Sequence, residues 1–374
     1  MGLWVGLMSG TSADAVDAAL VEIGRSPSEL RLVGFRSDPL PDPLRQRIHR
    51  AATSRLALRE LIRLDVEIGQ RFADSTLSLL RDCGVEARTV EGVGSHGQTV
   101  AHHPEAEVGG TLQLGSAAQI HARTGLRVVS DFRNADIAAG GQGAPLTPYL
   151  HHVLFARDSE PRAVLNIGGF TNVSYLPDSN AARLVAFDPG PGNALLDRAV
   201  REWGEGGERI DRDGRLARAG HVDTRLLEEL LSDPYFAKPP PKSTGHEHFG
   251  AGWLARARAS QARLEDLLAT LVALTVESVA RAAERFFDPM PARWLLYGGG
   301  VHNRALWQSF ERRLAPAIVE TTDPHGVPGD ALEAIAFALL GWASLRGLAN
   351  NVPAATGARR PVVLGSATPP AGSL

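Results

Sequence analysis

Glycine-rich turns follow apolar segments at three points of the chain, and turns of this kind can hold phosphate groups. They are Gly10-Thr11-Ser12, Gly168-Gly169 and Gly298-Gly299-Gly300. Glycine lets the backbone approach a ligand closely, and successive backbone N–H groups at a turn can bind an anion. One such turn alone is more often an ordinary tight turn, but three together suit a nucleotide held between two lobes.

Polar side chains surround the first of these turns. Thr11 and Ser12 offer hydroxyl groups, and Asp14 and Asp17 follow within a few residues. Mg²⁺ prefers one or two carboxylates together with water and phosphate oxygens, so these two carboxylates could hold a phosphate-bound Mg²⁺. The alternative is an ordinary polar hairpin tip without a ligand.

Asp188 is the candidate general base, because it ends an apolar strand and precedes Pro189-Gly190-Pro191-Gly192. Two prolines and two glycines restrict the backbone just beyond the carboxylate, which could then accept a proton from a nucleophile. The competing interpretation is that Asp188 caps the following helix. The residues themselves leave both interpretations open.

Two polar clusters and one isolated carboxylate complete the candidate site. His96, Gln98 and Thr99 could hydrogen-bond a polyol, and Arg133 is suited to a carboxylate. The alternative for the segment 131–136 is a surface ion pair that contributes little. Glu333 lies in an otherwise apolar helix, where it is either paired in the core or faces a cleft.

Composition excludes several classes of protein. The 374 residues allow two domains, and 44% hydrophobic with 22% charged residues is typical of a soluble globular protein. The net charge of −3 argues against nucleic-acid or anionic-membrane partners. No segment approaches the ~20 apolar residues of a membrane span, and no cleavable leader is expected at the N-terminus. A single cysteine, Cys83, excludes an internal disulfide. We expect a cytoplasmic enzyme or binding protein.

Common nucleotide and metal motifs are absent from the sequence. It contains neither a P-loop nor an opening dinucleotide fingerprint. Its 12 histidines show no zinc spacing, and the adjacent pairs His102-His103 and His151-His152 are interpreted as structural or surface residues. A nucleotide site in this chain must therefore be of another kind.

Two similar strand-rich stretches must position these residues. The first predicts strands at 3–8, 15–23 and 30–36, then helix from 42 to 83 with a break near 53–54. Residues 92–99 are expected to be a polar loop after a short strand, followed by a strand at 111–114, a helix at 116–123 and a strand at 127–130. The second stretch predicts strands at 163–167, 172–176 and 184–187. This repetition suggests a duplicated domain with a cleft between the copies.

The rest of the chain is predicted to be mainly helical. Helices are expected at 146–155, 194–203, 223–231, 253–263, 264–287, from about 303 onward and at 331–348, with strands at 294–297 and 319–321. Residues 353–374 are rich in Pro, Ala, Gly and Ser and are interpreted as a loose tail.

Taken together, these motifs resemble the anhydro-N-acetylmuramic acid kinases, sugar kinases of the actin and hexokinase superfamily. The resemblance covers residues 6 to about 365. Its motifs, in one order, are Met8-Ser9-Gly10-Thr11-Ser12-Ala13-Asp14-Ala15-Val16-Asp17, the segments 96–100, 131–133, 140–146, 165–169, 188–193, 232–236, 241–245 and 298–300, and Glu333. Three positions depart from the family pattern: Ala15 replaces Gly, Pro189 replaces Thr, and His246 stands where Arg is common. Ala15 would constrain the backbone if that position needs a positive φ.

The resemblance implies an α/β fold of two ribonuclease H-like lobes with a cleft between them, as in acetate and sugar kinases, heat-shock proteins and actin. It implies one lobe of residues 1–130 with about 341–374, carrying the phosphate hairpin and part of the sugar site. The other lobe, residues 131–340, would carry the catalytic aspartate and the adenosine-binding turn.

The resemblance also implies a coupled reaction. Water would open the 1,6-anhydro ring of 1,6-anhydro-N-acetylmuramic acid while O6 takes the γ-phosphoryl group of ATP, in peptidoglycan recycling and amino-sugar catabolism. Asp188 would be the catalytic base, Mg²⁺ the cofactor with Asp14 as its ligand, and the enzyme a homodimer. The implied sugar ligands are His96, Gln98, Thr99, Arg133 and Glu333. The implied ATP ligands are Gly10, Thr11, Ser12, Ala13, Asp14, Ala15, Val16, Asp17, Gly168, Gly169, Gly298, Gly299 and Gly300.

Two other functions remain open from the residues. A conventional sugar kinase of the same fold would use Asp188 to deprotonate a free hydroxyl group. A nucleotide-binding sensor or chaperone-like ATPase would not need the sugar-side motifs at 96–99 and 131–133. A purely structural protein is the poorest match, because three glycine turns and clustered polar residues would reduce the apolar core without adding stability.

Overall fold

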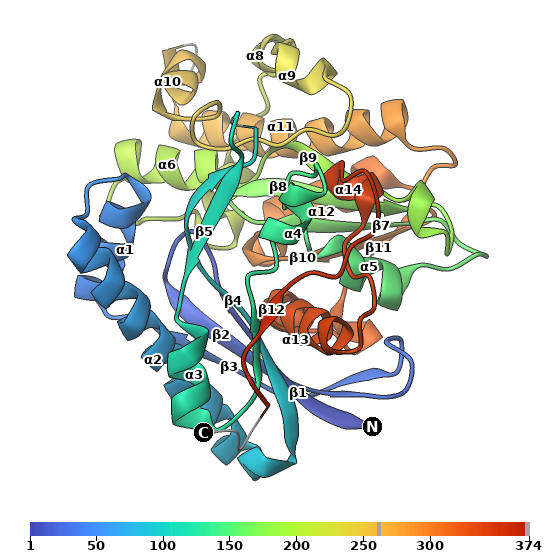
Figure 1. Ribbon diagram of the computed structural model, residues 1–374. Coiled ribbons are helices and arrows are strands. Elements are labelled where there is room, and N and C mark those ends of the chain that lie inside the picture. The colour runs from blue at the N-terminus through green and yellow to red at the C-terminus, as the bar shows by residue number, and fades with distance from the viewer. Residues whose placement is uncertain (106, 260–262, 371–374) are drawn as a thin grey trace. The chain divides into compact units, whose positions relative to one another are not determined.

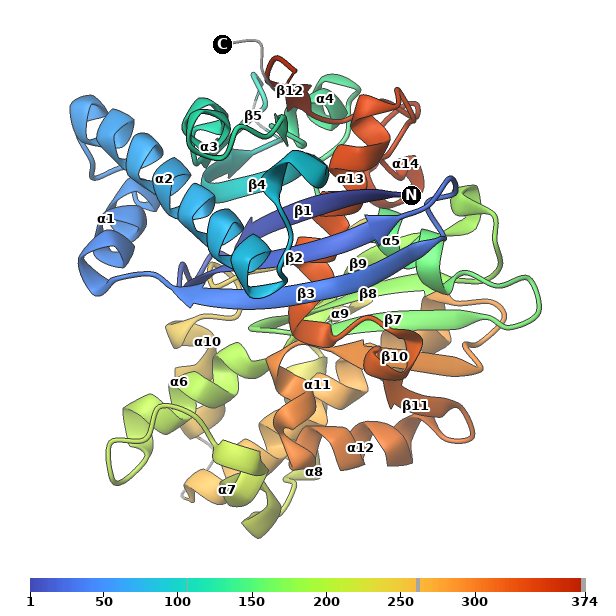
Figure 2. The same ribbon diagram turned by 90° about the horizontal axis from the view of Figure 1, so that it is seen from below.

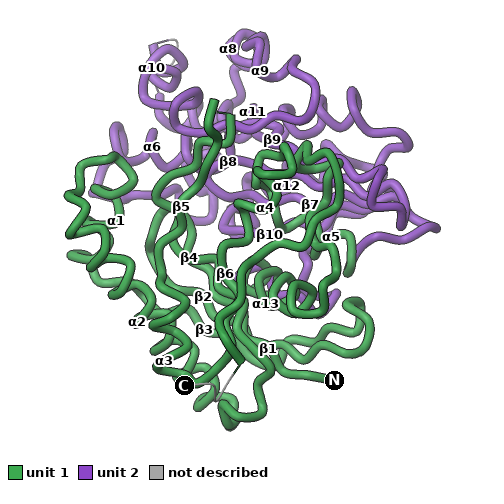
Figure 3. The backbone as a smooth tube through the Cα atoms, viewed as in Figure 1, with its two compact units in different colours: residues 1–154, 331–374 green, residues 155–330 purple. Residues whose placement is uncertain are grey.

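The computed structural model describes residues 1–105, 107–259 and 263–370. Its chain forms two compact units, unit 1 of Met1–Leu154 with Ala331–Leu374 and unit 2 of Phe155–Asp330 (Figure 3). The units therefore divide the chain after Leu154 and after Asp330, whereas the sequence-based lobes divide it after 130 and 340. Each unit is built around its own sheet.

Unit 1 contains a seven-stranded mixed sheet with the order β12-β6-β4-β1-β2-β3, and β5 pairs with β4 outside this path. Strands β1, β2 and β3 are antiparallel neighbours, and β4 and β6 extend the sheet in parallel from β1. The strands are β1 Gly2–Ser9, β2 Ala15–Ile23, β3 Leu30–Pro39, β4 Val90–His103, β5 Gly110–Leu114, β6 Val128–Ser130 and β12 Ser366–Ala367. The helices are α1 Asp42–Ala52, α2 Leu58–Asp82, α3 Ala117–Thr124, α4 Asn134–Ala138, α5 Pro148–Phe155, α13 Leu332–Leu345 and α14 Pro353–Thr356, with the 3₁₀ turn η1 Ala87–Thr89.

Alternation along β1 sends side chains to both faces of this sheet. Val5 and Leu7 are fully buried in the core that includes Ile68 and Phe72 of α2. Helices α1, α2 and α3 lie on that side and α13 lies on the other (Figures 1 and 2). A Cβ atom at Gly6 would lie 1.8 Å from the carbonyl oxygen of Ala334, and one at Gly94 1.9 Å from that of Phe337. Glycine at these two positions therefore lets α13 pack directly on the strands.

Unit 2 repeats the strand order of unit 1. Its five-stranded sheet has the order β11-β10-β7-β8-β9, with β7, β8 and β9 antiparallel and β10 and β11 parallel to β7. In both units, three antiparallel strands follow one another, and parallel strands extend the sheet beside the first of the three. This repeat confirms the predicted duplication and the α/β fold class. The strands are β7 Arg162–Ile167, β8 Phe170–Leu176, β9 Val185–Pro191, β10 Arg293–Tyr297 and β11 Ile318–Thr321.

Helix α11 forms the centre of the unit 2 core, with most of its length buried. The α-helices of the unit are α6 Asn193–Trp203, α7 Arg215–Ala219, α8 Thr224–Leu231, α9 Pro234–Ala237, α10 Ala251–Ala259, α11 Leu264–Phe286 and α12 Arg304–Leu314. Shorter turns are η2 Ala181–Arg183, η3 Arg212–Gly214, η4 Gly299–His302, η5 Asp323–His325 and η6 Gly329–Ala331. Residues 260–262 of the helix expected at 253–263 lie outside the described residues.

Three sequence-based expectations are wrong. Residues 92–99 are not a loop but the interior of the 14-residue strand β4, because they pair with β1 on one side. Asp188 does not end its strand but lies inside β9. Residues 353–370 are not a loose tail: Ala355, Thr356 and Leu364 are buried, and β12 pairs with β6. Residues 371–374 of that expected tail lie outside the described residues.

Within the described residues, no helix has the length and apolar character needed to cross a membrane.

Candidate active site

The first candidate turn is a hairpin tip in unit 1 that is held by Gln98. The N–H of Ala13 donates to the carbonyl of Gly10 at 3.0 Å, which closes the turn between β1 and β2. The amide of Gln98 donates to the Gly10 carbonyl at 3.0 Å, and its oxygen accepts from the Ser9 hydroxyl at 2.8 Å. Both ends of the buried Gln98 side chain thus bind the hairpin, so its contacts here are to the predicted phosphate turn.

Backbone conformation at this tip bears on one departure from the family pattern. Ala13 has a φ of 53°, in the left-handed region that favours glycine. Ala15 begins β2 and is not among the described residues with a positive φ. The alanine at position 15 therefore introduces no strain of the kind considered from the sequence.

The two acidic residues after this turn have different surroundings. Asp14 is exposed and forms an ion pair with Arg45 at 2.5 Å. Asp17 lies in β2, and its charge helps to raise the pKa of Glu333. Among the described residues, no three His, Cys, Asp or Glu side chains are grouped so as to hold a metal ion. An accessible carboxylate such as Asp14 still fits a Mg²⁺ ion that is held mainly by phosphate oxygens and water.

A buried polar cluster in unit 1 joins His96 to Arg133. The Nε and Nη2 groups of Arg133 donate to Nε2 of His96 at 3.1 and 2.8 Å, and Nη1 donates to the carbonyl of Gly143 at 2.7 Å. His96 is 4% exposed, and its Nδ1 lies 2.9 Å from the carbonyl of Gly97. His96 therefore carries its proton on Nδ1 and accepts from Arg133 at Nε2.

Burial sets the protonation states of this cluster. It lowers the pKa of His96 well below the usual value, and the positive charge of Arg133 adds to this effect, so the imidazole is neutral. Burial lowers the pKa of Arg133 to about 10, which leaves the guanidinium charged at neutral pH. Burial also raises the pKa of Glu333, although the charge of Arg133 opposes that rise. The cluster thus contains a positively charged guanidinium, and the neutral His96 ring and Gly143 carbonyl fix its orientation.

A strand irregularity directs His96 toward this cluster. Leu7 pairs with Ser95 and Ser9 with Gln98, so Met8 alone stands opposite His96 and Gly97. Gly97 has a φ of 79°. A β-bulge of this kind redirects a side chain and is common beside active sites. Thr99 lies just beyond it, and its hydroxyl accepts from the Gln113 amide at 3.3 Å.

Asp188 in unit 2 also lies at a bulge. Thr171 pairs with Gly190 and Val173 with Phe187, so Asn172 stands opposite Asp188 and Pro189. The Asn172 amide donates to Oδ1 of Asp188 at 2.8 Å, and the N–H of Thr244 donates to Oδ2 at 3.1 Å. Pro189 lies within this irregularity of the edge strand β9, which is where proline is tolerated in a sheet.

Burial raises the pKa of Asp188 to about 6, and the bonds from Asn172 and Thr244 and the charge of Lys242 oppose that rise. A carboxylate with this pKa is ionised at neutral pH and is a stronger base than an exposed aspartate. Helix α6 begins after Gly192 without a side-chain cap, and its first N–H groups bind the carbonyls of Gly168 and Gly169. Asp188 therefore does not cap α6, which was the alternative interpretation left open by the sequence.

A segment beyond β9 supports Asp188. The N–H of Asp188 donates to the Lys242 carbonyl at 3.0 Å, and the Tyr235 hydroxyl donates to the Asp188 carbonyl at 2.6 Å. The Lys242 ammonium donates to the Tyr235 and Phe236 carbonyls at 3.2 and 3.4 Å. Burial lowers the pKa of Lys242 to about 8. His246, the third departure from the family pattern, packs edge-on against Phe170.

The last glycine turn packs against the end of β7. Gly298 has a φ of 85°, and a Cβ atom there would lie 2.3 Å from Oδ1 of Asn166. A Cβ atom at Gly300 would lie 2.1 Å from a methyl group of Ile167. Both glycines are thus required by close packing. The same packing brings the 298–300 turn next to the end of β7, after which Gly168 and Gly169 follow directly in the chain.

Sequence reasoning assigned no role to several residues that surround the candidate groups. They are Asn172, Tyr235, Lys242 and Thr244, while Asp136 was noted only as a member of the polar segment 131–136. Asn172 lies opposite Asp188 only because of the strand register, which the sequence does not reveal. Lys242 and Thr244 belong to a motif already noted at 241–245, which was the available signal.

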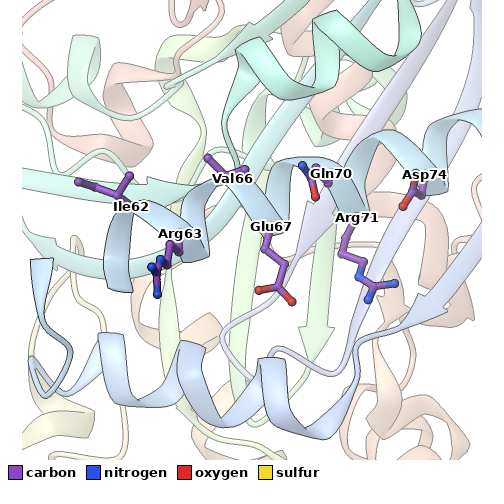
Figure 4. A pocket seen from close by; sticks show the side chains of 7 residues that line it. All are labelled: Ile62, Arg63, Val66, Glu67, Gln70, Arg71 and Asp74. Carbon is purple, nitrogen blue, oxygen red and sulfur yellow. The ribbon is translucent and has the colours of Figure 1, made fainter. Parts of the chain in front are cut away.

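A hollow in the surface of unit 1 lies apart from these groups. This hollow of about 610 Å³ lies along the outer face of α2 and is lined by Ile62, Arg63, Val66, Glu67, Gln70, Arg71 and Asp74 (Figure 4). Glu67 pairs with Arg47, and Asp74 pairs with Arg123 at 2.7 Å. None of the candidate site residues lines this hollow.

Each unit contains a sheet of the same strand order, with glycine turns at strand ends and, in unit 2, a buried aspartate of raised pKa; the class of protein to which this arrangement belongs is that of the kinases, as known relatives show. Comparison with known proteins narrows the class. The family model described as anhydro-N-acetylmuramic acid kinase matches residues 2–370, and the chain therefore belongs to this family of kinases.

Curated relatives agree with the family match. An anhydro-N-acetylmuramic acid kinase of Caldanaerobacter subterraneus subsp. tengcongensis is 40% identical over 97% of this chain and 96% of its own. One of Xanthomonas oryzae pv. oryzae is 42% identical over 98% and 97%. Among solved structures, the ROK hexokinase from Thermus thermophilus is similar with a TM-score of 0.41 and 14% identity over 92% of this chain and 99% of its own.

Proposed function

We propose that this protein hydrolytically opens 1,6-anhydro-N-acetylmuramic acid and phosphorylates O6 with ATP, giving N-acetylmuramic acid 6-phosphate and ADP. The family membership supports the substrate. The observation that carries the chemistry is Asp188, whose pKa of about 6 suits a base at neutral pH and whose two oxygens are oriented by Asn172 and Thr244. The reaction belongs to peptidoglycan recycling and amino-sugar catabolism.

One base is enough for this reaction, in which every bond that forms is matched by one that breaks. Asp188 takes a proton from water as the water oxygen bonds to C1 of the sugar. The bond between C1 and O6 breaks, O6 bonds to the γ-phosphorus of ATP, and ADP leaves. The phosphoryl group captures the leaving oxygen, so no second carboxylic acid is needed to protonate it, unlike in an inverting glycosidase. Asp188 then returns its proton to solvent.

The hairpin at 10–17 would contact the phosphates through its backbone N–H groups and the hydroxyls of Thr11 and Ser12. Asp14 would hold Mg²⁺, which supplies charge neutralisation of the triphosphate when bound. The turns at 168–169 and 298–300 would contact phosphate and adenosine. Gly168, Gly169 and Gly299 support this role, because a Cβ atom there would meet no atom closer than 3.6 Å, so the space beside the backbone is open to a ligand.

Arg133 would bind the lactyl carboxylate of the sugar. Its guanidinium is charged and largely buried, and its bonds to His96 and Gly143 leave N–H groups available for an anion. His96, Thr99 and Glu333 would contact the sugar nearby. Gln98 would contribute by holding the hairpin tip, since both ends of its amide bind Ser9 and Gly10.

The experiment is to incubate the protein with Mg-ATP and 1,6-anhydro-N-acetylmuramic acid and to weigh the product. We expect a gain of one phosphoryl group and one water. A gain of phosphoryl alone would identify a conventional hydroxyl kinase. ADP release without a sugar product would favour the sensor ATPase.

The family resemblance further supports a cytoplasmic homodimer without nucleic-acid or membrane partners. Sedimentation of the purified protein would test the dimer, and a mass equal to one chain at micromolar concentration would contradict it. Fractionation of the source cells would test the location.

A further inference from the structure

A fully buried carboxylate, Asp136, joins the C-terminal segment to the Arg133 cluster within unit 1. Asp136 lies on α4 and is 0% exposed. Its Oδ1 accepts from the Asn351 amide at 2.8 Å and the Thr356 hydroxyl at 2.7 Å, and its Oδ2 accepts from the Gly143 N–H at 2.8 Å. Burial of a carboxylate is costly unless it is well hydrogen-bonded. Three neutral donors satisfy it here.

Gly143 transmits this arrangement to Arg133. Its N–H is held by Asp136, and its carbonyl accepts from Nη1 of Arg133 at 2.7 Å. Gly143 has a φ of 65°, and a Cβ atom there would lie 2.9 Å from Ile137. Arg133 in turn donates to His96. The direction of the guanidinium therefore depends in part on Gly143, whose two adjoining peptide groups bind Asp136 through the N–H and Arg133 through the carbonyl.

Residues 350–364, here called the C-terminal clasp, also bind this loop through backbone hydrogen bonds. The Gln142 N–H donates to the Thr356 carbonyl at 2.7 Å, and the Arg359 N–H donates to the Ala139 carbonyl at 2.9 Å. Within the clasp, Oδ1 of Asn351 accepts from the Val362 N–H at 2.8 Å. Asn351 thus joins Asp136 to the segment around Val362.

We propose that Asp136 is a positioning residue for the acidic group of the sugar, and that the C-terminal clasp thereby contributes to substrate specificity. This inference rests on the proposed function for the identity of the sugar. Asp136 touches no reacting group, and its effect passes through Gly143 to Arg133. The clasp is then part of the sugar site, although its composition is that of a tail.

The test replaces Asp136 by Asn, which keeps one acceptor oxygen and turns the other into a donor. The bond from the Gly143 N–H is lost, and Gly143 is then free to move. We expect the KM for 1,6-anhydro-N-acetylmuramic acid to rise about tenfold, as for the loss of one charge-assisted contact, while kcat and the KM for ATP change less than twofold. In an Arg133→Lys background the same change should have little further effect on KM.

A second readout does not require turnover. The imidazole ¹⁵N resonances of His96, assigned by comparison with His96→Gln, report the hydrogen bond that Nε2 accepts from Arg133. We expect Asp136→Asn to shift the Nε2 resonance. If the wild-type protein lacked sugar kinase activity, the proposed function would fail, and this spectrum would still decide the positioning.

Asp211→Asn is the matched control. Asp211 is a buried aspartate of unit 2 whose two oxygens accept the N–H groups of Leu216 and Ala217 at 2.8 and 2.9 Å. It should lower stability without changing the sugar KM or the His96 spectrum. If Asp136→Asn does not fold, Thr356→Val removes one donor to Asp136 and should give a smaller shift in the same direction. Equal effects of Asp136→Asn and Asp211→Asn, or an unchanged KM and His96 spectrum in a folded Asp136→Asn, would overturn the inference.

Discussion

At the scale of single residues, the two candidate groups with the clearest chemistry are Asp188 and Arg133, and burial shapes both. Burial raises the pKa of Asp188 to about 6 and lowers that of Arg133 to about 10. Both groups nevertheless remain ionised at pH 7 to 8. Each carries a charge in surroundings of low polarity, where electrostatic interactions with substrate are stronger than in water.

Asp188→Asn should abolish ring opening, and wild-type kcat/KM should fall below about pH 6 as Asp188 becomes protonated. A pH profile of turnover with Mg-ATP and the anhydro sugar measures this. The control is the release of ADP in the absence of sugar, measured in parallel. Near-normal turnover by a folded Asp188→Asn protein would show that another group is the base.

The same substitution should stabilise the folded protein above pH 7. The native pKa of about 6 exceeds the ordinary aspartate value of 3.8, so between these two pH values the native state binds more protons than the unfolded state. Stability due to this group is therefore fully present below about pH 4 and is lost as the pH rises through 6. Removing the charge should raise the free energy of unfolding at pH 8 by at most about 3 kcal/mol, measured by urea denaturation. An equal or lower stability of Asp188→Asn at pH 8 would contradict the burial argument.

Arg133→Lys should raise the KM for the anhydromuramic acid at least tenfold with a smaller change in kcat. Lysine keeps a positive charge but loses the planar fork that donates to His96 and Gly143 at once. Steady-state kinetics with the anhydromuramic acid and with 1,6-anhydro-N-acetylglucosamine, which lacks the lactyl carboxylate, should show that the loss is confined to the acidic sugar. Equal losses for both sugars would contradict carboxylate recognition by Arg133.

At the scale of elements, bulges and covering segments position these residues. His96 and Asp188 both lie where one residue of the neighbouring strand stands opposite two. In β9 the exposed edge is covered by the segment that contains Lys242 and Thr244. A bulge redirects the side chain, and the covering hydrogen bonds keep it in that direction.

Tyr235→Phe tests the link between α9 and β9. The Tyr235 hydroxyl donates to the backbone carbonyl of Asp188 at 2.6 Å, and the phenyl ring would leave that carbonyl without this donor. We expect a loss of stability of about 1 kcal/mol and a lower kcat with an unchanged KM for ATP. Tyr175→Phe is the control, because its hydroxyl binds Pro289, away from Asp188. A kcat that falls equally in both variants would show that the effect is not specific to the α9–β9 link.

At the scale of the whole chain, the C-terminal residues complete unit 1 rather than extend from it. Leu364 is fully buried, and its N–H donates to Oδ1 of Asn350 at 2.6 Å. The hydroxyl of Ser344, at the end of α13, donates to the Leu364 carbonyl at 2.6 Å. These contacts attach the clasp to the helix that packs on the unit 1 sheet.

Leu364→Ala should lower the free energy of unfolding by about 2–5 kcal/mol, because it removes a fully buried side chain and leaves a cavity. Val363→Ala, at the neighbouring position that is 39% exposed, should change it by less than about 1 kcal/mol. Thermal or urea unfolding of the two variants measures the difference. Similar values for both would indicate that the clasp adds little to the stability of unit 1.

Much of the fold follows from local pattern. Apolar runs bounded by glycine and polar residues predicted β1, β2, β7 and β10 to within a few residues, because a strand buried on both faces needs such a run. The break near Thr53 separates α1 from α2 as expected. The motif order also identified the family, which the family match confirms.

The remaining features depend on residues that are distant in the sequence. Residues 92–99 looked like a loop because they contain three glycines, yet those at 92 and 94 lie in a strand between β1 and β6, with Gly94 under α13. The division after Leu154 and Asp330 likewise follows from which elements pack together. Neither property can be read from a local window.

The sequence by itself determined the strand and helix pattern, the duplication and the chemical groups at the candidate site, since these depend on residue type and short-range periodicity. Only the tertiary structure decided that Asp188 does not cap α6 but accepts hydrogen bonds from Asn172 and Thr244. It also decided that Gln98 binds the hairpin tip and that residues 350–364 are hydrogen-bonded to Asp136. These outcomes depend on strand register and on long-range hydrogen bonds. A buried polar group must find a partner wherever the fold brings one, and that partner can lie more than two hundred residues away in the chain.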